Sequence, residues 1–423
     1  MVRVLMLSWE YPPVVVGGLG RHVHALATSL ATIGHEVTVV TRHAPGSPLE
    51  ELREGVRIVR APQDPPLFTL STPTLLAWTM AFNHTLTRAA LRAAESNEFD
   101  IIHAHDWLVT HTAVTMAEHL DLPLVATIHA TEAGRHQGWL PEDLNRSIHS
   151  VEFWLGHRAS KVLVCSSYMK WEVTRLLELD KDRNKDKVEV IPNGVDSTVW
   201  KATSYAIKRA KARYAARGPL VGFAGRLVYE KGVQDLVEAV PKLRAEHPGL
   251  KVVIAGDGPY RDELQQACRK HHVTDTVDFA GFLSERELPA MLAATNATVV
   301  PSLYEPFGMV ALEAASAGAP LAVASTGGLA EIVQPGVTGM TFPHSDPSAL
   351  ADAVLSLLAE PIRAKAIAKR ALAMVCERYH WQGIAAQVGD AYDRTIREEP
   401  DFRAARLTET TPPIVVPEGN LLH

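Results

Sequence analysis

The chain has 423 residues, more than one hydrophobic core ordinarily serves, which predicts two or three domains. Hydrophobic residues make up 47% of the chain and charged residues 21%, as in ordinary globular proteins, and no apolar run is long enough to indicate a membrane span. The formal net charge of -6 excludes a global basic field for nucleic acid or anionic lipid. The three scattered cysteines exclude a disulfide scaffold and a CxxC metal site, so we expect a cytoplasmic protein.

The first half of the chain alternates short apolar runs with longer helical patterns. The opening run at 1–8 is too short for a signal-peptide core and is typical of a buried parallel strand. Further strands are expected at 37–41, 56–60, 101–104, 124–128, 162–165 and 188–191, and helices at 20–33, 77–96 and 107–119. This alternation predicts an α/β fold with a parallel sheet covered by helices on both faces.

The second half repeats the alternation. Strands are expected at 220–224, 251–255, 277–280, 297–300, 320–324 and 339–342, and helices at 232–245, 260–271, 284–294, 308–317 and 347–358. The sequence therefore predicts two doubly wound domains, 1–200 and 201–378, with a ligand cleft between them. A helical pattern follows at 379–398, and the tail at 399–423 lacks a core pattern and is expected to be largely disordered.

The stretch at 201–217 carries six basic residues and no acidic one. We interpret it as a solvated linker helix. Contact with a membrane surface or a partner is the alternative, although its apolar face is thin.

Ligands of doubly wound sheets bind beyond the carboxyl ends of the strands, so residues that follow strands are the candidates for chemistry. The first group is Gly17-Gly18-Leu19-Gly20, between the opening strand and a helix. Such a loop lets the backbone approach an anion at the helix N-terminus, or it is a tight turn and nothing more. The spacing is not GxGxxG, and Arg42 stands where a dinucleotide-binding domain has an acidic residue.

Two further groups in the first half contain histidine at strand ends. The first is His103-Ala104-His105-Asp106-Trp107, and the second places His129 after the strand at 124–128. One interpretation is a metal site formed by His103, His105 and His129, and the other is a set of polar residues around a substrate. A histidine such as His129 can also hold a sugar hydroxyl or transfer a proton.

Arg226 and Lys231 follow the first strand of the second half, five residues apart within a glycine-containing loop. Arginine offers a fork for phosphate oxygens and lysine a point charge, so the pair predicts an anion clamp. A solvated charged turn, with Glu230 between the cations, is the alternative.

The most specific spacing is Glu305-x7-Glu313, which contains Phe307, Gly308 and Met309 at an expected helix start. Free amides there favour an anion, and each carboxylate can accept two hydrogen bonds from a vicinal diol. Glu305 is suited to sugar hydroxyls and the deeper Glu313 to a ribose, unless both are unrelated surface residues. Ser325–Glu331 adds another glycine-rich turn after a strand. These groups together predict a site for a nucleoside diphosphate joined to a sugar.

On these motifs the chain resembles retaining glycosyltransferases of family four, which have the GT-B architecture of two facing Rossmann-like domains. The Ser8–Pro13, His103–Trp107 and Thr127–Glu132 segments resemble the glycogen-synthase-related branch, including actinobacterial α-(1→4)-glucosyltransferases of glycogen or methylglucose lipopolysaccharide synthesis. Glycogen synthases carry a Lys-x-Gly-Gly loop, and here Val15 occupies the lysine position.

The resemblance implies a role for each group. Arg226 and Lys231 would neutralise the diphosphate, with Gly17, Gly18 and the amides of Phe307, Gly308 and Met309 completing its cradle. Glu305 would hold the donor sugar and Glu313 the ribose, while His129 contacts the transferring sugar. Asp106 and His105 would face the donor sugar or the acceptor. The helix at 379–398 would cross back to the first domain.

The expected reaction is retaining transfer of glucose from ADP- or UDP-glucose to an α-(1→4)-glucan or methylglucose-type polysaccharide, with no cofactor and no metal. Transfer of another hexose to a small acceptor or sugar phosphate, and nucleotide-sugar epimerisation, are the alternatives. A metal-dependent hydrolase built on His103, His105 and His129 is more remote, because it leaves Arg226, Lys231 and the glutamate pair unexplained. The sequence leaves open whether the chain forms a homo-oligomer.

Overall fold

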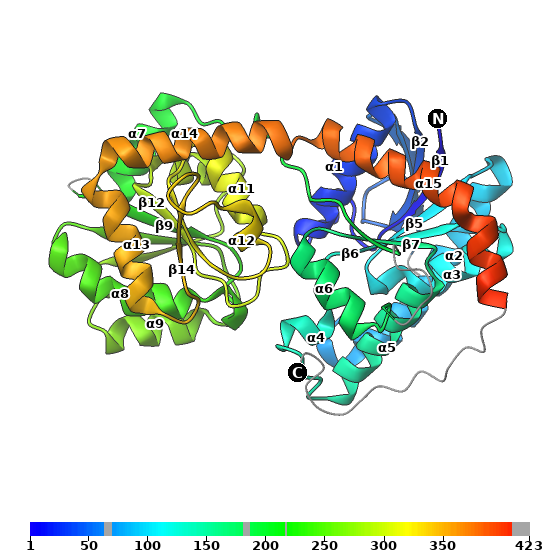
Figure 1. Ribbon diagram of the computed structural model, residues 1–423, viewed down its shortest axis with the longest axis horizontal. Coiled ribbons are helices and arrows are strands. Elements are labelled where there is room, and N and C mark those ends of the chain that lie inside the picture. The colour runs from blue at the N-terminus through cyan, green and yellow to red at the C-terminus, as the bar shows by residue number, and fades with distance from the viewer. Residues whose placement is uncertain (63–69, 181–186, 216–217, 408–423) are drawn as a thin grey trace. The chain divides into compact units, whose positions relative to one another are not determined.

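A computed structural model describes residues 1–62, 70–180, 187–215 and 218–407, the last seven of these by their backbone alone. The chain divides into two compact units, each built on its own sheet (Figure 1). Unit 1 comprises Met1–Gly194 and the segment from Trp381, and unit 2 comprises Val195–His380. The division falls at Val195 rather than at 201, and the return to unit 1 begins at Trp381 rather than at 379.

Unit 1 contains an eight-stranded sheet in the order β3-β4-β2-β1-β5-β6-β7-β8. All neighbours pair in parallel except β3 and β4. Chain order reverses between β1 and β5, so the loops after these two strands flank the point where doubly wound sheets bind ligands. The strands are β1 (Arg3–Leu7), β2 (Glu36–Arg42), β3 (Glu50–Arg53), β4 (Val56–Ala61), β5 (Ile101–His105), β6 (Leu124–Ile128), β7 (Lys161–Val164) and β8 (Val188–Val190).

Helices cover both faces of this sheet. On one face α1 and α15 pack together, and Leu26, Leu30 and Val388 join Val4 and Val39 of the sheet in a buried cluster. On the other face lie α2, α3 and α5. The helices are α1 (Gly18–Thr32), α2 (Leu75–Ser96), α3 (Thr110–His119), α4 (Glu132–Arg135), α5 (Asp143–Arg158), α6 (Ser167–Leu176) and α15 (Trp381–Leu407), with short 3-10 turns at Thr72–Thr74 and Trp107–Val109.

Unit 2 contains a six-stranded parallel sheet in the order β11-β10-β9-β12-β13-β14. This is the strand order 3-2-1-4-5-6 of nucleotide-binding doubly wound sheets, with its switch point between β9 and β12. The strands are β9 (Leu220–Ala224), β10 (Lys251–Ala255), β11 (Val277–Gly281), β12 (Ala297–Val300), β13 (Leu321–Ala324) and β14 (Met340–Phe342).

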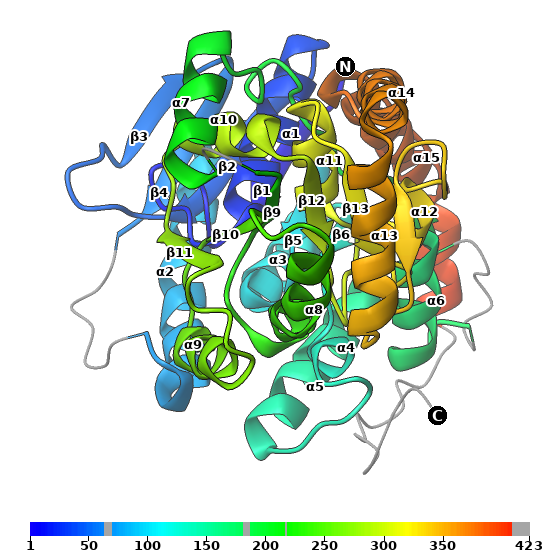
Figure 2. The ribbon, with the colours of Figure 1, turned by 90° about the vertical axis from the view of Figure 1, so that its left-hand side faces the viewer.

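The unit 2 sheet lies between two helical layers, visible above and below it in Figure 2. The layer of α8, α9 and α13 buries Val237, Leu264 and Val354 against the sheet, and α7, α10, α11 and α14 form the other layer. The helices are α7 (Ser204–Tyr214), α8 (Val233–Glu246), α9 (Arg261–Lys270), α10 (Glu287–Ala294), α11 (Met309–Ser316), α12 (Leu329–Ile332), α13 (Pro347–Ala359) and α14 (Pro361–Arg378), with a 3-10 turn at Tyr229–Lys231.

The predicted fold class, two Rossmann-like parallel-sheet domains, is confirmed. The basic stretch forms α7, which packs on α10, whereas residues 216–217 lie outside the described residues. The tail prediction needs correction, because α15 continues through Pro400 to Leu407 and its Thr395 and Glu399 side chains are buried. The rest of the tail, 408–423, lies outside the described residues.

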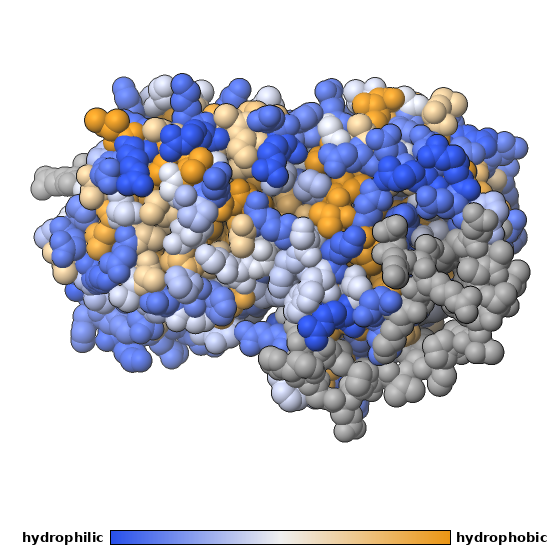
Figure 3. Space-filling model, in the orientation of Figure 1, coloured by the Kyte–Doolittle hydropathy of each residue, from blue (hydrophilic) through white to orange (hydrophobic). Residues whose placement is uncertain are grey.

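Among the residues that the structure describes, no helix combines the length and hydropathy needed to cross a bilayer. The faces seen in Figure 3 are a mosaic of hydrophilic and hydrophobic residues. This agrees with the composition, which showed no long apolar run.

Candidate active site

In unit 2 the predicted phosphate-binding and sugar-binding residues follow the two strands at the switch point. Arg226 and Lys231 lie in the loop after β9, and Glu305 lies in the loop after β12. The backbone amide of Leu303 donates to the Glu230 carbonyl oxygen at 2.8 Å, which joins the two loops. At the end of the first loop Gly232 has a φ of 67°, and a Cβ there would lie 1.9 Å from the Pro301 carbonyl oxygen. Only glycine, which has no Cβ, allows the two loops to lie this close together.

The Lys231 ammonium and the Glu305 carboxylate form an ion pair. Lys231 Nζ lies 2.8 Å from Glu305 Oε2, and both side chains are largely buried, with 20% and 11% of their surface exposed. The same carboxylate oxygen accepts a hydrogen bond from Ser302 Oγ at 2.9 Å. Two positioned donors thus hold a partly desolvated carboxylate in one orientation.

The Arg226 guanidinium is less constrained. It lies 3.9 Å from Glu230 Oε1, and 60% of its side chain is exposed. A contact of this length and exposure contributes little to stability, so the guanidinium is able to turn toward an anionic ligand.

Glu313 lies on α11, which begins just after Gly308, and its side chain is half-buried. The first-turn amides of a helix lack partners within the helix and attract anions. The loop before α11 is held by a hydrogen bond from the Gly328 amide to the Glu305 carbonyl oxygen at 2.9 Å. Phe307, within that loop, is buried and packs its ring on Tyr379. The Ser325–Glu331 turn thus supports the carboxylate loop.

In unit 1 the Gly17-Gly18 loop follows β1 and begins α1. Its conformation is fixed by the buried Glu10, whose Oε2 accepts hydrogen bonds from the Val16 amide at 2.7 Å and the Gly17 amide at 2.9 Å. Those two amides are therefore already occupied. Gly18 has open space where a side chain would stand, so the loop leaves room for a ligand at that residue.

The histidines at the ends of β5 and β6 meet at the switch point of unit 1. His105 Nδ1 and His129 Nε2 are 3.2 Å apart, within hydrogen-bond distance. Asp106, at a φ of 60°, accepts a hydrogen bond from the His129 amide at 2.8 Å through Oδ1. The Asp106 carboxylate therefore holds His129 in place from the neighbouring loop.

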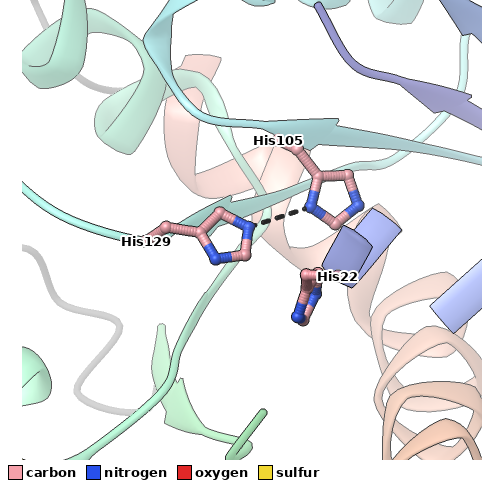
Figure 4. A group of neighbouring side chains, drawn as sticks. All are labelled: His22, His105 and His129. Atoms are coloured by element: carbon pink, nitrogen blue, oxygen red, sulfur yellow. Dashed lines mark hydrogen bonds between the residues drawn. The ribbon is translucent and has the colours of Figure 1, made fainter. Parts of the chain in front are cut away.

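His22 on α1 completes this group, and it was not predicted from the sequence (Figure 4). One nitrogen of each of His22, His105 and His129 lies within 4.8 Å of the other two. Burial lowers the pKa of all three, and the neighbouring imidazoles lower those of His22 and His105 further. All three rings are therefore neutral at physiological pH.

His103 does not belong to this group. Its Nδ1 lies 2.6 Å from the Tyr392 hydroxyl and its Nε2 lies 2.7 Å from Thr127 Oγ1. Burial, followed by repulsion from His129, lowers its pKa to about 3. The alternative prediction of a metal site formed by His103, His105 and His129 was wrong to include His103, because both nitrogens of the His103 ring already have partners in the core.

The structure therefore brings Arg226, Lys231 and Glu305 to one switch point and Gly17, Gly18, His105, Asp106 and His129 to the other. Sequence reasoning missed Ser302, Glu10 and His22. Glu10 precedes the glycine loop within the same segment and could have been considered as its acceptor. His22 lies within an ordinary amphipathic helix, where nothing in the pattern marks it.

Comparison with known proteins identifies the family of the chain. Residues 16–199 match the family described as Glycosyltransferase Family 4, and residues 205–374 match Glycosyl transferases group 1. The chain is 43% identical over 407 residues to glycogen synthase of Mycobacterium tuberculosis, with 92% of this chain and 94% of that protein covered. It is 30% identical to α-maltose-1-phosphate synthase of Mycolicibacterium smegmatis, with 92% and 99% covered. Sucrose-phosphate synthase from Thermosynechococcus elongatus has a similar structure, with a TM-score of 0.79, 24% identity, and 93% and 99% of the two chains covered.

The two doubly wound units and these matches define a glycosyltransferase of the GT-B fold. The chain belongs to family 4 of the glycosyltransferases, and it is a hexosyltransferase of the glycogen-synthase-like type.

Proposed function

We propose that the protein transfers glucose from ADP- or UDP-glucose to a 4-hydroxyl of an α-glucan or methylglucose-type polysaccharide, with retention of configuration, in the cytoplasm. The proposal is supported by the family and by the glycogen synthase relative. It is carried by one observation, the Lys231–Glu305 ion pair at the unit 2 switch point.

This pair places a cation and a sugar-hydroxyl acceptor side by side. A diphosphate bound near Lys231 would carry its sugar toward Glu305, whose carboxylate can accept hydrogen bonds from the 3- and 4-hydroxyls. Arg226 would turn onto the diphosphate, and the first-turn amides of α11 near Phe307, Gly308 and Met309 would complete the cradle. Glu313, deeper along α11, would hold the ribose diol.

In the reaction the bond between the sugar C1 and the phosphate oxygen breaks as a bond from C1 to the acceptor oxygen forms on the same face. The acceptor hydroxyl gives its proton to the departing phosphate oxygen. Arg226 and Lys231 stabilise the negative charge that grows on the diphosphate, which is the largest electrostatic demand of the step. We assign His129 to the transferring sugar and Asp106 with His105 to the positioning of His129, while Gly17 and Gly18 border the diphosphate.

A sugar phosphate is the second acceptor class. The relative from M. smegmatis is named for the product α-maltose 1-phosphate, which is a glucosylated glucose phosphate. The charge on such an acceptor distinguishes it from a neutral glucan.

A panel of donors and acceptors tests the proposal. ADP-glucose and UDP-glucose are each incubated with maltooligosaccharides, with glucose 1-phosphate and without acceptor, and nucleotide release and product linkage are measured by chromatography and proton NMR. We expect acceptor-dependent nucleotide release and a new α-(1→4) linkage. Epimerised donor, a β-linked product, or nucleotide release that does not depend on the acceptor would contradict the proposal. If product forms only with glucose 1-phosphate, then the acceptor is a sugar phosphate and not a glucan.

A further inference from the structure

The three neutral histidines of unit 1 have the arrangement of a metal site. His22 comes from α1, His105 from the end of β5 and His129 from the residue after β6, so three separate elements converge on one point (Figure 4). All three belong to unit 1, so the arrangement is complete without unit 2.

The distance between the two strand-end histidines suits a shared ion. Two imidazole nitrogens bound to one tetrahedral Zn²⁺ at about 2.0–2.1 Å are separated by about 3.3 Å. His105 Nδ1 and His129 Nε2 are 3.2 Å apart, so an ion can replace the proton that they share without a large change in this distance, although each ring must turn until its nitrogen points at the ion instead of at the other nitrogen. One nitrogen of His22 lies within 4.8 Å of a nitrogen on each of the other two rings, so His22 must move closer to bind the same ion.

The hydrogen bonding of the cluster is incomplete. Three buried ring nitrogens make no hydrogen bond of ordinary geometry with the residues that the structure describes: Nδ1 and Nε2 of His22, and Nε2 of His105. The Asn193 side chain lies beside His22. His105 is fully buried. Leaving buried polar atoms without partners costs free energy, and coordination of a cation is one way to recover it. Neutral imidazole is also the form that binds metals.

Other nearby groups are committed elsewhere. Both nitrogens of His103 have partners, and Asp106 Oδ1 accepts from the His129 amide. The protein therefore supplies three nitrogen ligands and leaves a fourth position for water or another small ligand. A set of three histidines suits Zn²⁺, Co²⁺, Ni²⁺ or Cu²⁺ and does not suit Mg²⁺, which prefers oxygen.

We propose that His22, His105 and His129 bind one divalent transition-metal ion, with Zn²⁺ as the reference ion, and that the ion inhibits the transferase. The inhibition rests on the proposed function, because it follows from engaging His129, the residue assigned to the transferring sugar. The binding itself does not depend on that assignment.

Direct binding is measured with Co²⁺, whose visible absorption reports a tetrahedral nitrogen site. The full chain is stripped with a chelator and titrated with Co²⁺ and then with Zn²⁺. We expect one Co²⁺ per chain with tetrahedral absorption, displaced by Zn²⁺. His22→Gln should weaken Co²⁺ binding at least tenfold. His129→Gln removes a different ligand and should also weaken Co²⁺ binding. His24→Gln, two residues away on α1 and paired with Glu54, is the matched control and should bind as the unaltered chain does.

Activity is measured on the same proteins. Zn²⁺ should inhibit the unaltered chain and His24→Gln reversibly, and His22→Gln should need at least tenfold more Zn²⁺. Absence of a stoichiometric cobalt spectrum, or equal binding by a folded His22→Gln protein, would overturn the site. Binding without inhibition would overturn the inhibitory role. A metal-free chain that binds Co²⁺ but transfers no glucose would contradict the proposed function and leave the site standing.

Discussion

The proposed donor site depends on the pairing of Lys231 with Glu305. The sequence predicted both residues, since each follows a strand in a glycine-containing loop. It did not predict that they would pair, because 74 positions separate them and only the sheet order brings β9 beside β12. Ser302 carried no signal at all, because an isolated serine after a strand has no distinguishing pattern.

Ser302 provides the first prediction. Its hydroxyl donates to Glu305 Oε2 and the residue is fully buried, so Ser302→Ala removes one of the two contacts that orient the carboxylate. A hydrogen bond to a charged group contributes about 1.5–3 kcal/mol, so kcat/KM for glucosyl transfer should fall by about 10- to 100-fold. Ser356→Ala, which removes a hydroxyl that bonds within α13, is the control and should leave kcat/KM unchanged. An equal rate for the two variants would contradict the orienting role.

Glu152 provides a pH-dependent prediction. It is buried on α5, its Oε2 lies 3.7 Å from His149 Nδ1, and burial raises its pKa from 4.5 to about 7. Between these values the folded protein keeps a proton that the unfolded chain has lost, so the carboxyl group lowers stability as pH rises from about 4.5 to 7. Above pH 7 this loss is complete.

Glu152→Gln removes that titration and keeps the shape of the side chain. The free energy of unfolding of the variant relative to the unaltered chain should therefore increase between pH 5 and 8, by about 1–3 kcal/mol. Denaturant titrations at several pH values measure this, with exposed Glu95→Gln as the control. A difference that stays constant with pH would show that the Glu152 pKa is not raised.

Among the single elements, buried parallel strands and several amphipathic helices were predictable because their periodicity is strong. The helices α5, α6 and α14 were not predicted. The missed strand, β3, is a polar antiparallel edge strand with the sequence EELR, and mostly exposed residues leave no apolar pattern to detect. The end of α15 was missed for a different reason. The sequence from 399 onward lacks a core pattern, but the helix continues, with Thr395 and Glu399 buried, past Pro400 to Leu407.

The loop between β9 and α8 provides the element-scale prediction. Gly232 has a positive φ, and a Cβ at this position would collide with the Pro301 carbonyl oxygen. Gly232→Ala should therefore destabilise unit 2 by more than about 2 kcal/mol and lower transferase activity, because the Lys231 loop must move. Gly281 has nearly the same φ, 68°, but a Cβ there would meet no described atom within 4 Å, so Gly281→Ala should cost only about 1 kcal/mol. Chemical denaturation of both variants measures the difference, and equal losses would refute the collision.

At the scale of the whole molecule, the chain leaves unit 1 at Gly194 and returns to it at Trp381. The two sequence halves predicted two sheets, whereas the return rested on the family resemblance. The physical basis of the return is the core that α15 completes, where Ile384, Val388 and Tyr392 are buried with residues of α1 and the sheet. The Tyr392 hydroxyl also bonds His103 Nδ1 at 2.6 Å.

Tyr392→Phe should therefore weaken unit 1 selectively. The change leaves a buried imidazole nitrogen without its partner, which costs about 1–3 kcal/mol. Native-state hydrogen exchange should show faster opening of β1, β5, α1 and α15, with β9 to β14 unchanged. Tyr205→Phe, on an exposed ring of α7, should change neither unit. Faster exchange in the unit 2 strands would contradict the assignment of α15 to unit 1.

We propose that Lys231 neutralises a departing nucleoside diphosphate, and steady-state glucosyl transfer by Lys231→Ala measures this role. Lys242→Ala is the matched control, since Lys242 lies exposed on α8 of the same unit and its ammonium contacts Asp352 and Ser348 on α13. Loss of one charge-stabilising group in an active site lowers turnover by about 100-fold or more. We predict that loss for a folded Lys231→Ala protein and near-normal turnover for Lys242→Ala, whereas near-normal turnover by Lys231→Ala would contradict this role.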